Sequence, residues 1–322
     1  MRAVRIDQYG GPDVLRLTTV DDPEPGPGQL LVATAAIGVN YIDTYQRGGH
    51  YPVPLPFTPG LEGAGTVRAV GAGVTEFAAG DRVAWSGTPG SYAELVTVAA
   101  DAAVPVPDDV SNELAAAVPL QGMTAHYLVT STYPVRPGDT VLVHAAAGGV
   151  GLLLTQLAKA RGARVIGTVS TDEKEKLARA AGADEIVRYT EQDVAAEVRR
   201  LTDGAGVAAV YDGVGASTFD ASLASLRPRG ILVLFGASSG PVPPFDLQRL
   251  NSGGSLFVTR PTLGHHTATR AELLWRATEL FDAIGAGRLN VRIGGRYPLA
   301  EARRAHEDLQ ARRTTGKVLL LP

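Results

Sequence analysis

A run of glycines between an apolar strand and an apolar helix is the segment of this sequence best suited to chemistry. The strand is predicted over 140–145, the turn reads Gly148, Gly149, Val150 and Gly151, and the helix covers 150–160. Glycines let the backbone approach a pyrophosphate, whose negative charge then lies against free N–H groups at the helix start. Glycines also serve purely structural tight turns. The strand before them and the helix after them favour dinucleotide binding here.

The end of the next predicted strand, over 164–169, indicates which dinucleotide binds. Sites for NAD usually place an acidic residue there, about 20 residues after the glycines, to bond the ribose hydroxyls. This chain has Ser170 and Thr171 followed by Lys174, and hydroxyls with an ammonium suit the extra phosphate of NADPH. Asp172 and Glu173 lie nearby and more naturally stabilise the first turn of a helix. A helix cap is the alternative role for the two hydroxyl residues, and a solvated surface position is the alternative for Lys174.

Metal-ligating and nucleophilic residues are sparse. The chain has no cysteine, which excludes disulfides, iron–sulfur clusters, thiolate zinc sites and cysteine nucleophiles. No Ser–His–Asp order or nucleophile elbow is present. The adjacent His265 and His266 are expected in a surface loop. No spacing typical of metal ligands relates the six histidines, which are His50, His126, His144, His265, His266 and His306. We therefore expect a protein that contains no metal.

The predicted elements around these residues follow two patterns of secondary structure. The first third is rich in short strands separated by glycine, proline and aspartate, and these are predicted over 2–6, 15–20, 30–37, 66–70, 82–85 and 92–98. From residue 138, strands alternate with helices, the pattern of a parallel sheet built from β-α-β units. The C-terminal part returns to a mixed texture, with a helix over 300–312 and a strand over 317–321. A β-α-β domain is thus inserted between two parts of a β-rich domain.

The composition is that of a globular protein. Of 322 residues, 30 are basic and 33 acidic, which leaves a formal net charge of -3 and argues against nucleic acid as the main partner. The first residues read as a short strand and turn without the apolar core of a signal peptide, and no apolar run is long enough to cross a bilayer. These features predict a soluble, cytoplasmic protein.

Several separate motifs, in a fixed order along nearly the whole chain, carry the signature of one known family. They are residues 40–45 (NYIDTY), 119–125 (PLQGMTA), 138–159 around the glycines, and 258–261 (VTRP). With them the chain resembles the quinone oxidoreductase (zeta-crystallin-like) branch of the medium-chain dehydrogenase/reductase superfamily. The resemblance implies an α/β protein in which a Rossmann doubly wound parallel sheet is inserted in a β-rich GroES-like catalytic domain. It implies a catalytic domain over 1–120 and 261–322, and an NADPH-binding Rossmann domain over 121–260.

The resemblance also assigns roles that spacing alone does not. It implies that Asn40 and Tyr45 lie over the nicotinamide and orient a carbonyl or quinone oxygen. Capping of the helix over 41–47 is the alternative for Asn40, and half-buried packing is the alternative for Tyr45. Besides Ser170, Thr171 and Lys174, the resemblance implies NADPH contacts from Thr124, Ala147, Gly148, Gly149, Val150, Gly151, Tyr189, Gly213, Phe235, Gly236, Ser238, Arg260 and Arg312. Among these, Phe235 is most simply a core residue, and Arg313 lies beside Arg312.

The zinc enzymes of the same superfamily need ligands that this chain lacks. Asn40 stands where the first ligand is expected, residues 60–62 read GLE where a histidine is expected, and the segment 85–91 is too short for a structural zinc lobe. Without a Lewis acid, oxidation of an alcohol is disfavoured. The resemblance therefore implies zinc-independent transfer of a hydride from NADPH to a quinone or related α,β-unsaturated carbonyl.

Two other functions stay open at this point. An enoyl reductase of the same superfamily shares the cofactor and the hydride chemistry, although no concentrated basic cluster suits an acyl-CoA. An NADPH-binding structural or RNA-binding protein without turnover, as among zeta-crystallin relatives, is the alternative from a different class. The resemblance further implies a homodimer that pairs edge strands near 255–258.

Overall fold

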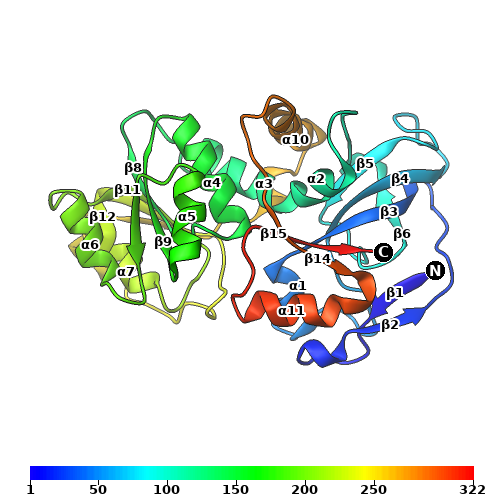
Figure 1. Cartoon of the computed structure of the whole chain (residues 1–322), viewed down its shortest axis with the longest axis horizontal. Coiled ribbons are helices and arrows are strands. Elements are labelled where there is room, and N and C mark those ends of the chain that lie inside the picture. The colour runs from blue at the N-terminus through cyan, green and yellow to red at the C-terminus, as the bar shows by residue number, and fades with distance from the viewer. The chain divides into compact units, whose positions relative to one another are not determined.

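The computed structural model describes all 322 residues, and the chain divides into two compact units. Unit 1 contains Met1–Met123 and Thr267–Pro322, and unit 2 contains Thr124–His266. Figure 1 labels the helices and strands of both units. Unit 2 is continuous in sequence, whereas unit 1 is built from the two ends of the chain.

Unit 2 is built around a six-stranded sheet with the strand order β10-β9-β8-β11-β12-β13. Its strands are β8 (Thr140–Val143), β9 (Arg164–Val169), β10 (Glu185–Arg188), β11 (Val207–Asp212), β12 (Leu226–Leu234) and β13 (Phe257–Thr259). Every pairing in this sheet is parallel. All residues of β11 are buried, as a central strand covered on both faces requires. The predicted doubly wound sheet of an α/β protein is confirmed.

Helices join these strands and cover the sheet. They are α4 (Gly149–Ala160), α5 (Asp172–Ala180), α6 (Val194–Leu201), α7 (Phe219–Ser225), α8 (Gln248–Ser252) and α9 (Leu263–His266). Figure 1 shows α4 and α5 together on one side of the sheet and α6 with α7 on the other. The side chains of Thr171 and Asp193 accept from first-turn N–H groups of α5 and α6. These caps fix where the two helices begin.

Unit 1 contains a seven-stranded, mostly antiparallel sheet with the order β14-β15-β3-β4-β5-β7, in which β6 also pairs with β3. Its strands are β3 (Gln29–Val39), β4 (Glu62–Val70), β5 (Arg82–Ser86), β6 (Leu95–Ala99), β7 (Ala103–Pro105), β14 (Ile293–Pro298) and β15 (Lys317–Leu321). A separate pair is formed by β1 (Arg2–Arg5) and β2 (Arg16–Thr19). Because β15 pairs with β3, the C-terminal strand completes a sheet that the N-terminal part begins. The predicted β-rich domain is confirmed.

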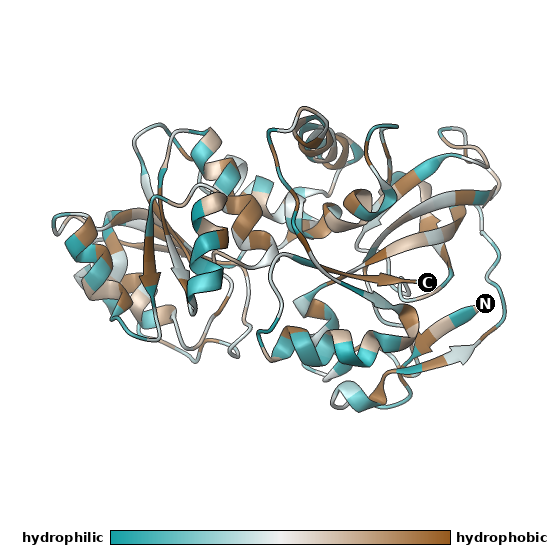
Figure 2. Cartoon of the chain, viewed as in Figure 1, coloured by the Kyte–Doolittle hydropathy of each residue, from teal (hydrophilic) through white to brown (hydrophobic).

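Five longer helices accompany this sheet. They are α1 (Tyr41–Arg47), α2 (Asn112–Ala117), α3 (Pro119–Tyr127), which continues into unit 2, α10 (Arg270–Gly285) and α11 (Ala302–Gln310). Figure 2 shows hydrophobic colour along the strands and hydrophilic colour on much of α11, as expected of a helix with one face in a core. No helix combines the length and the apolar character needed to cross a bilayer.

One expectation for the segment 257–285 needs correction, and one helix in it was missed. The adjacent His265 and His266 lie in the short helix α9 rather than in a loop, and the His266 ring stacks on Tyr127 with centroids 4.2 Å apart. The long helix α10 was not predicted. Its start carries a capping box, in which Thr269 and Glu272 bond each other's backbone N–H groups. That four-residue pattern was the available sequence signal.

Candidate active site

The turn between β8 and α4 leaves no room for larger side chains where the backbone passes itself closely. A Cβ on Gly151 would lie 2.3 Å from the carbonyl oxygen of Ala145, which is backbone and cannot move aside. Ala145 itself has a φ of 50°, in the left-handed region, so the backbone turns sharply at this residue. Gly148 is the N-cap of α4. The first N–H groups of the helix therefore lack intrahelical partners and suit a bound anion such as a pyrophosphate.

The ends of β9 and β10 bring together the residues predicted to hold the 2′-phosphate of NADPH. The backbone N–H of Tyr189 donates to the last carbonyl of β9 at 3.3 Å, and the Tyr189 side chain is exposed. Lys174 lies in the first turn of α5, and its own N–H donates to the Thr171 hydroxyl at 3.3 Å. Ser170, Lys174 and Tyr189 thus lie at one strand tip. Thr171 has the capping role that was its alternative.

An arginine that the sequence pattern did not single out lies among the acidic residues of the same tip. Arg188, the last residue of β10, forms ion pairs with Asp172 and, at 2.9 Å, with Glu175. Hydrogen bonds from Arg179 and Arg188 hold the pKa of the Glu175 carboxyl below its usual range. Because arginines neutralise both carboxylates, these acids repel a phosphate less than their number suggests. The available signal was the position of Arg188 beside Tyr189, at a strand end.

The ends of β11 and β12 meet through their backbones. The N–H of Phe235 donates to the Asp212 carbonyl at 2.8 Å, and the N–H of Ser238 donates to the Gly213 carbonyl at 3.3 Å. A Cβ on Gly236 would lie 2.4 Å from the Gly213 carbonyl oxygen. The Phe235 ring lies against Gly213 and is partly exposed, so it is not a fully buried core residue. These residues lie at the carboxyl edge of the sheet, where open α/β sheets bind ligands.

Asp212, which was not among the predicted site residues, organises this edge. Its side chain is fully buried. The carboxylate accepts four hydrogen bonds of 2.7 to 3.0 Å, from the N–H groups of Val214 and Gly215 and from the hydroxyls of Thr218 and Ser222. A buried carboxylate with four donors fixes the path of the loop after β11. Asp212 is a supporting residue of the candidate cofactor site.

The remaining residues predicted to contact NADPH lie in four places. Arg260 follows β13 and donates to the carbonyl of Leu234 at 3.1 Å. Thr124 on α3 and Ala147 before α4 are both buried. Arg312 belongs to unit 1, in the turn after α11, where its φ is 59°. Their contacts with a cofactor stay predictions.

Asn40 lies in unit 1 at the end of β3, inside a buried polar cluster. Its Nδ2 donates to Glu62 at 2.7 Å, and its Oδ1 accepts from Lys317 at 2.9 Å and from Gln121 at 3.1 Å. Lys317 and Glu62 also form a salt bridge, with side chains 1% and 0% exposed. The Glu62 carboxylate accepts further from the N–H of Leu120 at 2.6 Å. The cluster neutralises two buried charges, and Asn40 joins it to β3.

Tyr45 belongs to a cluster of three tyrosines on and after α1. Its ring centroid lies 5.6 Å from that of Tyr41 in a tilted arrangement and 5.5 Å from that of Tyr51 in an edge-to-face arrangement. Tyr51 is exposed, whereas Tyr45 is partly buried. Burial raises the pKa of Tyr41, against the opposing effect of Arg312. The three rings offer an aromatic surface of the kind that packs against another planar ring.

A chain of hydrogen bonds connects α1 to α11. Tyr92 donates to Asp43 at 2.8 Å and lies 3.0 Å from Nε2 of His306, whose Nδ1 lies 2.9 Å from the Arg47 guanidinium. A guanidinium can only donate, so Nδ1 accepts and Nε2 carries the proton. Burial raises the pKa of Asp43 to about 7 and lowers the pKa of His306 to about 3. The neutral imidazole therefore has a fixed tautomer, and Asp43 titrates near neutral pH.

No three His, Asp or Glu side chains are grouped so that they could hold a metal ion. The buried His144 is bonded instead to hydroxyls, with Thr168 at 3.2 Å and Ser222 at 3.0 Å. His306 is bonded to Tyr92 and an arginine, as described above. The expectation of a metal-free protein stays a prediction.

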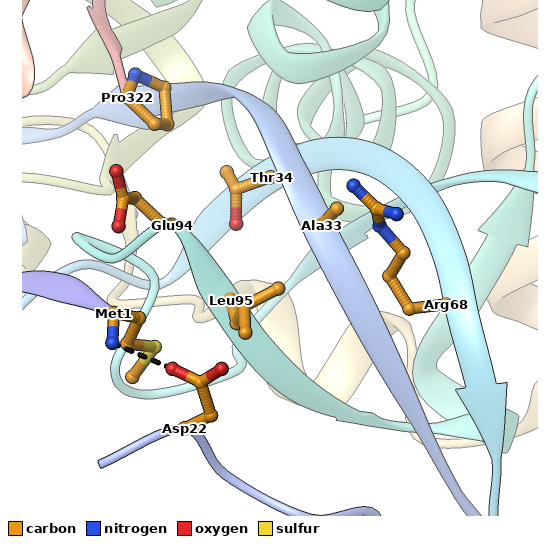
Figure 3. A pocket seen from close by; sticks show the side chains of 8 residues that line it. All are labelled: Met1, Asp22, Ala33, Thr34, Arg68, Glu94, Leu95 and Pro322. Atoms are coloured by element: carbon orange, nitrogen blue, oxygen red, sulfur yellow. Dashed lines mark hydrogen bonds and ion pairs between the residues drawn. The ribbon is translucent and has the colours of Figure 1, made fainter. Parts of the chain in front are cut away.

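A hollow in unit 1 contains none of the residues predicted for the site. Its lining includes both chain ends, and its ammonium and acidic groups are paired, Met1 with Asp22 and Glu94 with Arg2, each at 2.6 Å. Figure 3 shows the eight lining residues, which are Met1, Asp22, Ala33, Thr34, Arg68, Glu94, Leu95 and Pro322. We therefore assign it no part in the chemistry.

Known proteins match the same two-part architecture. A family model described as an alcohol dehydrogenase GroES-like domain matches residues 26–108, and one described as a zinc-binding dehydrogenase matches residues 149–274. A quinone oxidoreductase of Pseudomonas aeruginosa is 50% identical over 323 residues, which cover 100% of this chain and 99% of that protein. A 2-haloacrylate reductase of Burkholderia sp is 43% identical, with 99% and 98% covered. The solved structure of a mycobacterial protein complexed with NADPH matches with a TM-score of 0.98 and 58% identity, covering 100% of both chains.

Proposed function

The chain belongs to the quinone oxidoreductase family of the medium-chain dehydrogenase/reductase superfamily, and from this premise we propose that it is an NADPH-dependent quinone oxidoreductase. The observation that carries the proposal is the similarity to a quinone oxidoreductase along the full length of both chains. The similar mycobacterial protein complexed with NADPH supports the choice of cofactor. The site described above supplies the chemical reasons.

NADPH supplies the hydride when it is bound, and residues of unit 2 fit its parts. The turn Gly148–Gly151 suits the pyrophosphate because its glycines remove side chains from a helix N-terminus. Lys174 and Tyr189, at the strand tip beside Ser170, suit the 2′-phosphate. Gly213 and Gly236 carry no side chain where the backbones at the β11 and β12 ends pass closely, which suits the nicotinamide end.

The tyrosine cluster of α1 supports a planar substrate. A quinone ring can pack against Tyr41, Tyr45 and Tyr51, and the Tyr45 phenol can donate to a quinone oxygen. The buried charges of Glu62 and Lys317, which both bond Asn40 at the start of α1, neutralise each other, so this pair leaves no net charge there.

The overall reaction transfers one hydride and one proton. A quinone that accepts a hydride becomes a hydroquinone anion, and a proton from solvent or a nearby hydroxyl completes the hydroquinone. A phenol that donates a hydrogen bond to the reacting oxygen stabilises the negative charge that develops there. We assign that positioning role to Tyr45. No ionised side chain of this chain is required for the hydride step.

The direct test is the stoichiometry of turnover. Purified protein is mixed with NADPH and an excess of 1,4-benzoquinone, and NADPH loss and hydroquinone formation are measured together. We expect one hydroquinone for each NADPH oxidised. NADPH binding without any turnover above the protein-free rate would contradict the proposal and favour the NADPH-binding structural or RNA-binding alternative.

A second candidate reaction is reduction of a carbon–carbon double bond conjugated to a carbonyl group. The full-length similarity to a 2-haloacrylate reductase favours it, because that reaction uses the same class of electrophile. The two candidates are separated by kcat/KM for a quinone and for 2-chloroacrylate, measured with the same enzyme and saturating NADPH. A higher kcat/KM for 2-chloroacrylate would make reduction of the conjugated double bond the preferred function instead of quinone reduction. An enoyl thioester in the same series tests the enoyl reductase alternative.

We also propose a homodimer that pairs β13 edges. β13 is the last strand of its sheet, and Phe257 on it is 59% exposed. An uncovered strand edge with a large apolar side chain favours association with a second copy. Sedimentation of the protein and of its Phe257→Asp variant tests this, since only the unmutated protein should sediment as a dimer. The cytoplasmic location stays a prediction that cell fractionation can check.

A further inference from the structure

The carboxamide of Asn40 has no hydrogen-bonding capacity left for a ligand. Its two N–H groups point to the Glu62 carboxylate at 2.7 Å and to the Gly38 carbonyl at 3.3 Å. Its oxygen accepts from Lys317 at 2.9 Å and from Gln121 at 3.1 Å. An asparagine side chain has two donors and two acceptor positions, so all four are occupied inside unit 1. Asn40 is also only 2% exposed.

Chemistry fixes the orientation of this amide. The Lys317 ammonium can only donate and the Glu62 carboxylate can only accept, so the Asn40 oxygen must face Lys317 and its nitrogen must face Glu62. A 180° flip would set a donor against the ammonium and an acceptor against the carboxylate, with all three groups buried. The Asn40 oxygen is therefore held in one place as the acceptor for Gln121.

Gln121 is the member of this cluster that keeps free capacity. One N–H of its Nε2 donates to Asn40, while its Oε1 is buried and receives no hydrogen bond. The residue as a whole is partly exposed, unlike Asn40, Glu62 and Lys317. The cluster thus ends in one unused N–H and one unused carbonyl oxygen on Gln121.

We propose that Gln121, rather than Asn40, is the carboxamide that contacts the substrate, and that Lys317 and Glu62 are positioning residues that act on it through Asn40. The inference rests on the proposed reductase function. A quinone oxygen accepts from the free N–H of Gln121, and the hydroxyl oxygen of the hydroquinone can accept from the same N–H. One side chain can therefore bond both the oxidised and the reduced ligand without changing its own protonation.

The first test replaces Gln121 with methionine, which has a similar length and no comparable hydrogen-bonding groups. Gln121→Met should lower kcat/KM for 1,4-benzoquinone about 3- to 10-fold at saturating NADPH, the effect of one neutral hydrogen bond. Its Kd for NADPH and its Tm should stay close to those of the unmutated protein. The matched control is Gln8→Met at an exposed position, which should leave all three values unchanged.

A double-mutant cycle tests the positioning role. If Asn40 acts through Gln121, Asn40→Ala should lower kcat/KM, and the double variant should lose little more than the larger single loss. Additive losses would overturn the positioning claim, and unchanged kcat/KM in Gln121→Met would overturn the substrate contact. Both readings require turnover by the unmutated protein. If the unmutated protein shows no turnover, both the proposed function and this inference are refuted. If it turns over but Gln121→Met has unchanged kcat/KM, the inference alone fails.

Discussion

Substitution of Lys174 by alanine should separate the two nicotinamide cofactors. NADPH and NADH differ only in the 2′-phosphate, and Lys174 lies at the strand tip where that phosphate is expected. A hydrogen bond to a charged group contributes ~1.5–3 kcal/mol, and partial exposure with salt screening favours the lower figure. Since about 1.4 kcal/mol corresponds to tenfold in Kd, Lys174→Ala should weaken NADPH about tenfold. The Kd for NADH should hardly change.

The same helix offers a matched control for this experiment. Lys176 is exposed two residues farther along α5, so Lys176→Ala removes the same charge from a different face. Both variants and the unmutated protein are titrated with NADPH and NADH at low and at high salt. Only Lys174→Ala should lose affinity for NADPH and flatten its salt dependence. Equal Kd values for the two cofactors in the unmutated protein, or equal losses in both variants, would refute the direct contact.

Three further predictions concern single side chains. Tyr45→Phe should lower the rate of quinone reduction roughly 2- to 13-fold, as loss of one positioning hydrogen bond does, whereas a loss of ~10⁴-fold would mark an obligatory proton donor. Gly151→Ala forces a methyl group against a backbone carbonyl, so calorimetry should show a lower Tm and titration a weaker affinity for NADPH. Arg188→Gln leaves Asp172 without its ion-pair partner, so NADPH should bind a few-fold more weakly while NADH is less affected. Adding Asp172→Asn to this variant should restore the affinity for NADPH. If it does not, the arginine acts on NADPH binding in some way other than by neutralising Asp172.

The prediction of a cofactor site in unit 2 rested on local patterns. The glycine turn and the strand tip each occupy a few consecutive residues. The strand and the helix that flank each of them are also local in sequence, and this context is what predicts dinucleotide binding. The sheet order brings Tyr189 next to the β9 end, as expected for neighbouring parallel strands. Arg188 was not found because its ion pairs depend on which side of β10 faces α5. That choice is made by tertiary packing.

The Asn40 cluster could not be predicted in the same way. Lys317 lies 277 residues from Asn40 and 255 from Glu62, and it reaches them because β15 pairs with β3. No local period or motif encodes that pairing. The family resemblance pointed to Asn40 as a substrate contact, but it did not reveal that the amide is already saturated by its neighbours. Only the three-dimensional contacts show that Gln121 is the member with capacity to spare.

The buried pair Asp43 and His306 should give opposite contributions to the pH dependence of stability. The pKa of Asp43 is raised from 3.8 to about 7, so the folded state binds its proton more tightly; this stabilisation is full below about pH 4 and is lost as the pH rises towards 7. The pKa of His306 is lowered from 6.5 to about 3, so its contribution is full above pH 6.5 and is lost as the pH falls towards 3. Between about pH 4 and 6.5 the two effects oppose each other.

Asp43→Asn removes one side of that balance while keeping the size of the side chain. In this variant the free energy of unfolding should rise with pH from 4 to 6.5 more steeply than in the unmutated protein, by up to ~1.4 kcal/mol per pH unit for the one proton involved. Urea denaturation at several pH values measures both slopes, and the exposed Asp101→Asn serves as the control. A slope that does not change in Asp43→Asn would mean that the Asp43 carboxyl does not hold its proton in the folded state, and that the hydrogen-bonded chain to His306 is ionised at its α1 end.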